Sequence, residues 1–277
     1  MKTLDGKVVV ITGAGSGIGR ALALNAARQG AVLALSDWDE VGLVETAQQV
    51  QTSTHREVRT DKLDVRDREA VRAYAASVAA GLGRVNVVVN NAGVALHGDF
   101  EEMSYEDFEW VMDVDFWGVV QGTKEFLPHL IASGDGHVVN ISSVFGLFSV
   151  PGQAAYNAAK FAVRGFTEAL RQEMELAGHP VKVTTVHPGG IKTNIVRNMT
   201  AVETVDKDQL THTFDKKLAN TSPEKAAKII LDGVRKNRAR VLVGPDAKAL
   251  DLIVRLTGSG YQRLFSTVMS RMVPEAL

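Results

Sequence analysis

A glycine-rich segment near the N-terminus constrains the fold of this chain more than any other feature. Residues 8–11 are continuously apolar, as in a strand that is buried on both faces of a sheet. Residues 12–19 follow with the sequence TGAGSGIG, and a helical pattern then runs from about Ile18 to Gln29, closed by Gly30. Backbone N–H groups and the positive end of a helix dipole meet at such a junction. The segment therefore predicts a phosphate-binding turn between a buried strand and a helix.

Three glycines of this turn have separate predicted roles. Gly13 permits the tight turn, Gly17 lets a pyrophosphate approach the backbone, and Gly19 lets the helix pack closely on the strand. Asp37 ends the next predicted strand, where a carboxylate accepts hydrogen bonds from the adenosine ribose hydroxyls and repels a 2′-phosphate. Neither neighbour of Asp37 in the sequence is basic, which favours NAD over NADP. The alternative is that Asp37 caps the helix that follows it.

The remainder of the chain alternates between short apolar runs and helical patterns. Further strands are expected at 31–36, 58–63, 85–89, 138–142, 181–186 and 240–243. Helices are expected at 40–50, at 69–80 with an end at Gly81, at 106–130 with interruptions at Gly118 and Gly122, at 156–176, and from Ser222 with Pro223 in the first turn. This alternation predicts an α/β fold, a doubly wound parallel sheet of about seven strands with helices on both faces. The 277 residues, 45% of them hydrophobic, are expected to form a single domain, 1–277.

Composition excludes several classes of function. The chain has no cysteine, which excludes disulfides, thiolate catalysis and cysteine-based zinc sites, and its histidines are not clustered as metal ligands. A formal net charge of -1 without a basic stripe argues against nucleic acid as a partner. We recognise no signal peptide and no apolar run of about 18 residues. Because a chain without cysteine also fits a reducing compartment, a cytoplasmic protein is expected.

Ser143, Tyr156 and Lys160 form a candidate proton-transfer group. Tyr156 and Lys160 are one turn apart in a predicted helix, so they share a face, and Ser143 lies upstream after a predicted strand. A free tyrosine has a pKa of about 10 and is a poor base at neutral pH. A lysine charge beside it favours the phenolate and lowers the tyrosine pKa. Alternatively, the pair is a surface contact and Ser143 is a helix cap.

With these segments the chain resembles the classical short-chain dehydrogenase/reductase family from about Lys7 to Val243. Four family motifs occur in the family's order: TGxxxGxG at 12–19, NNAG at 90–93, the catalytic segment at 140–143 with Tyr156-x-x-x-Lys160, and the PG loop at 188–193. The resemblance implies a single-domain Rossmann-like fold, a homotetramer or homodimer, and hydride transfer between a nicotinamide and a secondary alcohol or ketone. It implies that Tyr156 exchanges a proton with the substrate oxygen, that Ser143 holds this oxygen, and that Lys160 also holds the nicotinamide ribose.

The resemblance also implies which residues bind the dinucleotide. The predicted set is Gly13, Ser16, Gly17, Ile18, Gly19, Asp37, Asp64, Val65, Asn91, Tyr156, Lys160, Pro188, Gly189, Ile191 and Thr193. Asp64 and Val65 are expected along the adenine, and Asn91 near the adenosine ribose. Ile191 and Thr193 are expected at the nicotinamide carboxamide. His187, directly before the PG loop, is interpreted as a packed strand residue.

One position departs from the family pattern. The family has a fourth catalytic residue, an asparagine that helps to hold a water linking the lysine to solvent, and here that position is Asp115. An aspartate can still accept a hydrogen bond from that water. Its negative charge is expected to raise the pKa of Lys160 and to offset part of the effect of Lys160 on Tyr156. We expect the proton relay to survive with Asp115 as a catalytic residue.

The loops expected to form the substrate walls are apolar. They comprise residues 94–97, 144–151 and 194–199, which favour an apolar substrate with one hydroxyl or ketone group. Alternatively, these loops pack against each other or against a neighbouring subunit, and Arg197 meets a carboxylate or phosphate. The polar stretch at about 190–221 is expected to be a substrate lid.

Further alternatives concern the C-terminal stretch and the activity. Residues 248–277 are expected to be a helical extension that packs on the domain or at a subunit interface, and the alternative is a helix lying on a membrane surface. An NADPH-dependent acyl-chain ketoreductase is a second candidate activity, against which Asp37 argues. A non-catalytic dinucleotide-binding regulator is a third, against which the intact Ser143, Tyr156 and Lys160 argue.

Overall fold

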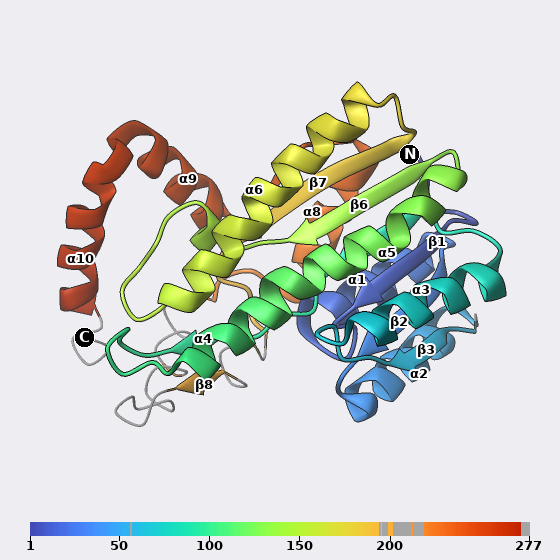
Figure 1. The fold of residues 1–277 in the computed structure, drawn as a ribbon, viewed down its shortest axis with the longest axis horizontal. Coiled ribbons are helices and arrows are strands. Elements are labelled where there is room, and N and C mark those ends of the chain that lie inside the picture. Colours follow the sequence, from blue (N-terminus) through green and yellow to red (C-terminus); the bar gives the residue numbers. More distant parts are fainter. Residues whose placement is uncertain (56, 194, 196–198, 202–211, 213–218, 273–277) are drawn as a thin grey trace.

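The computed structural model describes residues 1–55, 57–193, 195, 199–201, 212 and 219–272. Its centre is one parallel sheet of seven strands in the order β3-β2-β1-β4-β6-β7-β9 (Figure 1). The strands are β1 (Val8–Thr12), β2 (Val32–Asp37), β3 (Arg59–Lys62), β4 (Val87–Asn90), β6 (Gly136–Ile141), β7 (Val181–Pro188) and β9 (Arg240–Val243). The sheet is built outward from β1 in one direction and from β4 in the other, so the switch point lies between these two strands.

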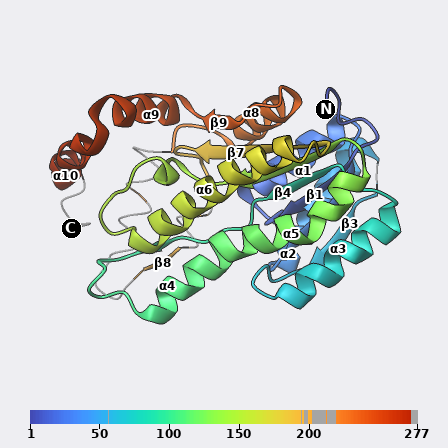
Figure 2. The same cartoon turned by 45° about the horizontal axis from the view of Figure 1, so that its top comes forward.

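Helices cover both faces of the sheet (Figures 1 and 2). One face carries α1 (Gly17–Arg28), α2 (Glu40–Thr54) and α8 (Pro223–Arg235), and the other carries α3 (Arg68–Leu82), α5 (Gly118–Ala132) and α6 (Ala154–Leu176). Successive side chains of a strand point to opposite faces, so Val9 and Ile11 join one core while Val10 joins the other. The predicted α/β fold is confirmed, and all seven predicted strands are present.

Three further helices and a small second sheet lie near the carboxyl ends of the strands. Helix α4 (Tyr105–Met112) precedes α5, and α9 (Pro245–Thr257) and α10 (Tyr261–Met272) extend beyond the sheet toward the C-terminus (Figure 2). The second sheet, which the sequence did not predict, pairs β5 (Leu96–His97) with β8 (Thr200–Ala201). In the part of the chain that the structure describes, no helix has the length and apolarity needed to cross a membrane.

The predicted end of the third helix at Gly81 is wrong. Helix α3 continues to Leu82 and ends at Gly83, whose φ of +75° is the left-handed conformation that commonly terminates helices. Gly81 has no such backbone angle and stays within the helix. Helix α8 begins as predicted, since the Ser222 hydroxyl accepts a hydrogen bond from the Lys225 N–H.

The predicted helix interruptions at Gly118 and Gly122 are also wrong. The irregularity is a π-helical turn, η1 (Asp113–Trp117), which comes just before α5. A Cβ atom at Gly118 would lie 2.8 Å from Val65 Cγ2, and one at Gly122 would collide with the Asn90 side chain. Both glycines therefore let α5 approach its neighbours closely, and neither ends the helix.

Candidate active site

The predicted phosphate-binding turn lies at the switch point of the sheet, between the carboxyl ends of β1 and β4. The Asn91 side chain, just after β4, donates hydrogen bonds to the carbonyls of Thr12 and Gly13, each over 3.0 Å. A Cβ atom at Gly13 would lie 2.7 Å from Ala92 Cα, so no larger residue fits there. The first and second family motifs are thus held against each other in the crevice where open α/β sheets bind ligands.

The start of α1 has the features of an anion site. Ser16 is the N-cap residue, and its side chain does not cap the helix, so the N–H groups of the first turn remain for a ligand. Gly17 has φ of +52°, and a Cβ atom there would lie 3.1 Å from Thr193 Cγ2 in the PG loop. Gly19 faces the Gly13 carbonyl so closely that any Cβ would collide with it. This cradle of backbone groups fits a pyrophosphate, with Ile18 in the same turn.

Asp37 lies at the end of β2, beside the glycine turn. Its carboxylate accepts hydrogen bonds from the Gly15 N–H over 2.7 Å and from the Asp39 N–H over 2.9 Å. The alternative that Asp37 caps α2 is wrong, because the cap is Asp39, which accepts from the Gly42 N–H. The Asp37 carboxylate therefore lies at the glycine turn.

Arg20 is a charged residue near this turn that the sequence interpretation missed. Its guanidinium donates to the carbonyls of Gly15 and Gly42 and forms an ion pair with Glu45 over 3.0 Å. These bonds join α1, the glycine turn and α2, and they occupy the guanidinium. The sequence signal that could have identified Arg20 was its position directly after Gly19, inside the first turn of α1.

The three predicted proton-transfer residues come together at the carboxyl end of the sheet. Ser143 follows β6, and Tyr156 and Lys160 lie on α6, all three buried. The Ser143 Oγ accepts a hydrogen bond from the Phe145 N–H over 3.1 Å, so its own proton remains for another acceptor. The Lys160 ammonium lies 5.4 Å from the centre of the Tyr156 ring. The alternative of a surface Tyr–Lys pair is therefore wrong.

Asp115 lies beside Lys160 and is fully buried, at 0% exposure. Its Oδ2 is 3.0 Å from Lys160 Nζ, and its Oδ1 accepts from the Val94 N–H over 2.7 Å. The π-helical turn carries it inward between α4 and α5. Lys160 also donates to the Ile141 carbonyl over 3.4 Å. The departure from the family pattern thus forms a buried ion pair with the lysine.

Burial and charge act in opposite directions on this group. Burial opposes the charge of Lys160, but Asp115 and Tyr156 outweigh it and raise the pKa of Lys160, as predicted for an aspartate at this position. Burial raises the pKa of Tyr156, Asp115 raises it further, and Lys160 and Ser143 oppose the rise. Burial likewise raises the pKa of Asp115, against the Lys160 charge and the Val94 N–H. Lys160 does favour the Tyr156 phenolate, but burial keeps the tyrosine pKa above its ordinary value.

The PG loop follows β7 and lies against α9. The Gly190 N–H donates to the Asp246 carboxylate over 2.7 Å, and a Cβ at Gly189 would collide with the same carboxylate. Ile191 is buried and bridges to Thr221. Asp246 was not predicted, because the sequence does not reveal that the start of α9 folds back onto this loop. Pro188 ends β7 and Thr193 faces the turn at Gly17.

Asp64 and Val65 follow β3, as expected, but their side chains already have protein partners. The Asp64 carboxylate pairs with the Arg66 guanidinium over 2.6 Å. Val65 packs against Gly118 of α5. Of the predicted lid at 190–221, most lies outside the described residues, as do Asn194, Val196, Arg197 and Asn198 of the third predicted wall.

An aromatic cluster links the catalytic tyrosine candidate to the C-terminal helix. It consists of Phe145, Phe148, Tyr261 and Phe265. The Phe145 ring lies 6.1 Å from the Tyr156 ring and 5.5 Å from that of Phe148, and Phe148 lies 4.9 Å from Phe265. The Tyr261 hydroxyl accepts from the Ser149 N–H over 3.1 Å. Helix α10 therefore packs on the loop that follows Ser143, which favours the packed-helix prediction over a membrane-surface helix.

The polar residues near the predicted walls include two histidines. His97 is buried after the NNAG motif, and its Nδ1 lies 2.8 Å from Gln153 Nε2. His187, interpreted from the sequence as a packed strand residue, is fully buried, and its Nδ1 lies 2.7 Å from the Ser143 carbonyl. Its contact with a candidate catalytic residue was not predictable, because it joins two segments that are distant in the sequence.

Comparisons with known proteins agree with this geometry. The family model for short chain dehydrogenases matches residues 7–204. The putative oxidoreductase SadH of Mycobacterium tuberculosis is 58% identical over 276 residues, which cover 100% of both chains. The probable oxidoreductase EphD of Mycobacterium bovis is 38% identical over 96% of this chain and 45% of its own length.

Solved structures show the same fold. A short chain dehydrogenase/reductase from Burkholderia phymatum in complex with NAD has a TM-score of 0.87 and 30% identity, covering 95% of this chain and 97% of that one. An alcohol dehydrogenase from the archaeon Thermococcus sibiricus, complexed with 5-hydroxy-NADP, has a TM-score of 0.71 and 28% identity, covering 87% of this chain and 95% of that one. This chain therefore belongs to the short-chain dehydrogenase/reductase family and is an NAD(P)-dependent oxidoreductase.

Proposed function

We propose that this enzyme transfers a hydride between NAD and the carbon of a secondary alcohol or ketone on an apolar substrate. The observation that carries the proposal is the buried group of Ser143, Tyr156 and Lys160, at the same end of the sheet as the glycine turn. The nicotinamide, when bound, supplies the hydride acceptor or donor. A secondary alcohol then loses a hydride from carbon and a proton from oxygen, and this proton needs a base in the protein.

The proposed roles follow from the geometry of this group. Tyr156 takes the alcohol proton as a phenolate and returns it to the carbonyl oxygen in the reverse direction. The free proton of Ser143 Oγ holds the substrate oxygen within reach of Tyr156. Lys160 stabilises the phenolate, and Asp115 lies next to Lys160 on the path by which the proton leaves.

The proposed dinucleotide contacts are those predicted from the sequence. Gly13, Ser16, Gly17, Ile18 and Gly19 supply the turn for the pyrophosphate, and Asp37 accepts from the adenosine ribose. Asp64, Val65 and Asn91 border the adenosine, and Pro188, Gly189, Ile191 and Thr193 border the nicotinamide. The preference for NAD is supported by the Asp37 charge at the turn and by the occupied guanidinium of Arg20. NADP would place a phosphate against Asp37.

Replacing Asp37 by Asn is expected to lower the NADH preference by at least about tenfold, equivalent to about 1.4 kcal/mol. The amide keeps an oxygen for the Gly15 N–H but removes the charge that repels a 2′-phosphate. The measurement is kcat/KM for NADH and for NADPH with one ketone. Asp39→Asn, which changes the nearby cap of α2, serves as the matched control. An unchanged NADH-to-NADPH ratio would refute the role of Asp37.

The proposed function itself is tested by oxidation of NADH and NADPH over a panel of apolar ketones. An apolar substrate is supported by the partly buried Phe145 ring beside Tyr156 and by the Ala95, Leu96 and Met199 cluster that packs on the same tyrosine. Turnover of small ketones with NADH supports the proposal. Turnover confined to acyl-chain substrates with NADPH favours a ketoreductase, and no turnover with any carbonyl favours a dinucleotide-binding regulator.

We also propose that the enzyme is a homodimer or homotetramer in the cytoplasm. Trp117 and Phe161 remain 44% and 39% exposed on η1 and α6, which contact each other on one face of the molecule. Light scattering on the purified protein is expected to give two or four times the chain mass of 29.8 kDa. Trp117→Glu is expected to shift that mass toward the monomer, and a wild-type monomer would refute the assembly.

A further inference from the structure

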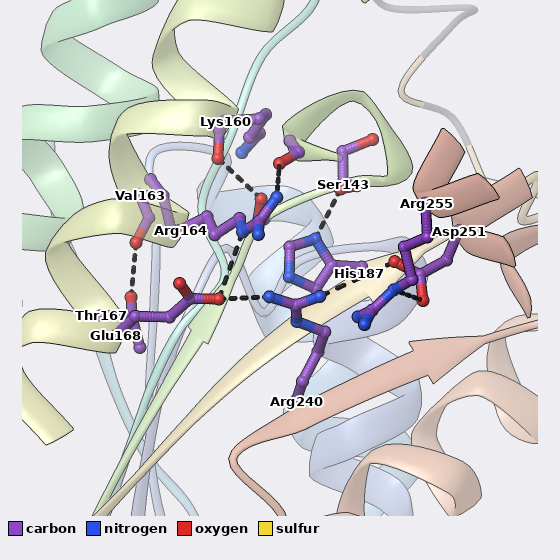
Figure 3. Close-up of polar contacts among 12 residues, drawn as sticks. Ser143, Lys160, Val163, Arg164, Thr167, Glu168, His187, Arg240, Asp251 and Arg255 are labelled. Carbon is purple, nitrogen blue, oxygen red and sulfur yellow. Dashed lines mark hydrogen bonds and ion pairs between the residues drawn. The ribbon is translucent and has the colours of Figure 1, made fainter. Parts of the chain in front are cut away.

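His187 forms a direct contact with the candidate catalytic serine. It lies near the end of β7, is 0% exposed, and places Nδ1 2.7 Å from the Ser143 carbonyl oxygen (Figure 3). Because a carbonyl only accepts hydrogen bonds, Nδ1 carries the proton and Nε2 does not. Among the described residues, Nε2 has no hydrogen-bond partner although it is buried.

The unpaired nitrogen indicates that His187 is more than a filler of the core. A buried polar atom without a partner is destabilising, and an apolar side chain at the same place would avoid this cost. Burial lowers the pKa of His187 to about 4, with a further decrease from Arg240 and Arg164, against the Ser143 carbonyl and Glu168. The imidazole is therefore neutral at working pH and keeps Nδ1–H as a permanent donor.

The backbone explains why a side chain is needed at this point. Strands β6 and β7 pair up to Ile141 and Val186, and the Ser142 N–H donates to the Val186 carbonyl. Pro188 has no N–H and cannot donate the next bond of this ladder to β6. In this register that bond would have ended on the Ser142 carbonyl, so Ser143 follows directly after the gap in the ladder, and the His187 side chain links it to β7 instead.

The far end of the same turn is also held. The Arg164 guanidinium donates to the Gly146 carbonyl over 3.4 Å and pairs with Glu168, which in turn pairs with Arg240 (Figure 3). Within the turn, the Gly146 N–H donates to the Ser143 carbonyl over 3.0 Å. The turn from Ser143 to Gly146 is therefore fixed at its first residue by His187 and at its last by Arg164.

We propose that His187 is a positioning residue for the reaction, which holds the Ser143 backbone so that the serine hydroxyl points to the substrate oxygen. This inference rests on the proposed function of Ser143. It adds to Ser143, Tyr156 and Lys160 a residue from strand β7 that itself touches neither substrate nor cofactor. The contact also joins the serine to the PG loop, because Pro188 and Gly189 directly follow His187.

His187→Leu removes the donor, and His187→Asn keeps an N–H at about the position of Nδ1. Displacing a substrate-binding group by about 1 Å costs on the order of 100-fold in rate, so we expect His187→Leu to lose 10- to 100-fold in kcat. We expect His187→Asn to stay within a few-fold of the wild type. The dissociation constant for NADH, measured by tryptophan fluorescence, is expected to be unchanged in both variants.

A double-mutant cycle separates positioning from general damage. In a Ser143→Ala background, His187→Leu is expected to cause little further loss, because the hydroxyl that it positions is already absent. An equal loss in both backgrounds would overturn the inference. If His187→Leu does not fold, His187→Gln replaces it, since its amide reaches the position of Nε2 and leaves the serine carbonyl without a donor. Equal rates of the Asn and Gln variants would then overturn the inference.

Tyr156→Phe, measured in parallel, separates this test from that of the proposed function. An active Tyr156→Phe would overturn the proposed function and the role of His187 together. An inactive Tyr156→Phe beside a His187→Leu variant with wild-type kcat would overturn the role of His187 alone.

Discussion

Replacing Tyr156 by Phe is expected to reduce turnover by roughly 10²–10⁴-fold, the usual contribution of a positioned acid or base. The substitution removes the hydroxyl that exchanges the proton and keeps the ring, which packs edge-to-face on Phe145 6.1 Å away. The fold and the glycine turn are therefore expected to persist. The measurements are kcat with a responsive ketone, the thermal melting curve, and the NADH dissociation constant from tryptophan fluorescence.

Tyr105→Phe is the matched control for this experiment. Tyr105 is exposed at the start of α4, and its loss of a hydroxyl is expected to leave turnover unchanged. Retention of more than about a tenth of the wild-type kcat in Tyr156→Phe would contradict the proton-transfer role, because general acid–base catalysis is worth more than this.

Removing the Asp115 side chain is expected to have the largest effect on stability. Asp115→Leu leaves the Lys160 ammonium buried with no opposite charge, and breaking a buried ion pair in this way costs about 3–5 kcal/mol. It also leaves the Val94 N–H without its acceptor. Urea denaturation of the variant and the wild type at neutral pH measures the change in the free energy of unfolding. A loss below about 1 kcal/mol, as for exposed pairs, would contradict a structural role for the buried pair.

Asp115→Asn separates the charge from the shape. The carboxylate raises the pKa of both Lys160 and Tyr156, so its replacement by a neutral amide is expected to lower both. Alcohol oxidation requires the Tyr156 phenolate, so the rise of the oxidation rate with pH is expected to shift to lower pH. Asp113→Asn, an exposed position on the same π-helical turn, is the control. Coincident pH profiles of Asp115→Asn and the wild type would show that the charge has no special role.

The elements that the sequence predicted best are those with local signals. The continuous apolar run of β1 followed by glycines indicated a buried strand that turns into a helix, and Ser222 before Pro223 marked the start of α8. The same local reasoning misplaced the break near Gly118. A glycine at this position lets α5 pack closely against Val65. This contact joins segments that are distant in the sequence, so the hydrophobic periodicity of the helix does not predict it.

The parts of the site that escaped prediction depend on tertiary contacts. Spacing indicated that Tyr156 and Lys160 share a helix face, and the family pattern placed the Asp115 charge near Lys160, but neither indicated that the two form a direct ion pair at 3.0 Å. The sequence also could not show that His187 reaches the Ser143 carbonyl, or that Asp246 accepts from the PG loop. Each of these contacts joins residues from different strands or helices, whose proximity follows from the fold.

Helix α10 has a consequence for changing the substrate range of this enzyme by design. Its residues Tyr261 and Phe265 contact Phe148 and Ser149, on the loop that follows the catalytic serine candidate. Because α10 follows every strand of the seven-stranded sheet, it can be exchanged without re-threading any of them. Grafted helices with other aromatic or aliphatic residues at these positions offer a route to new selectivity.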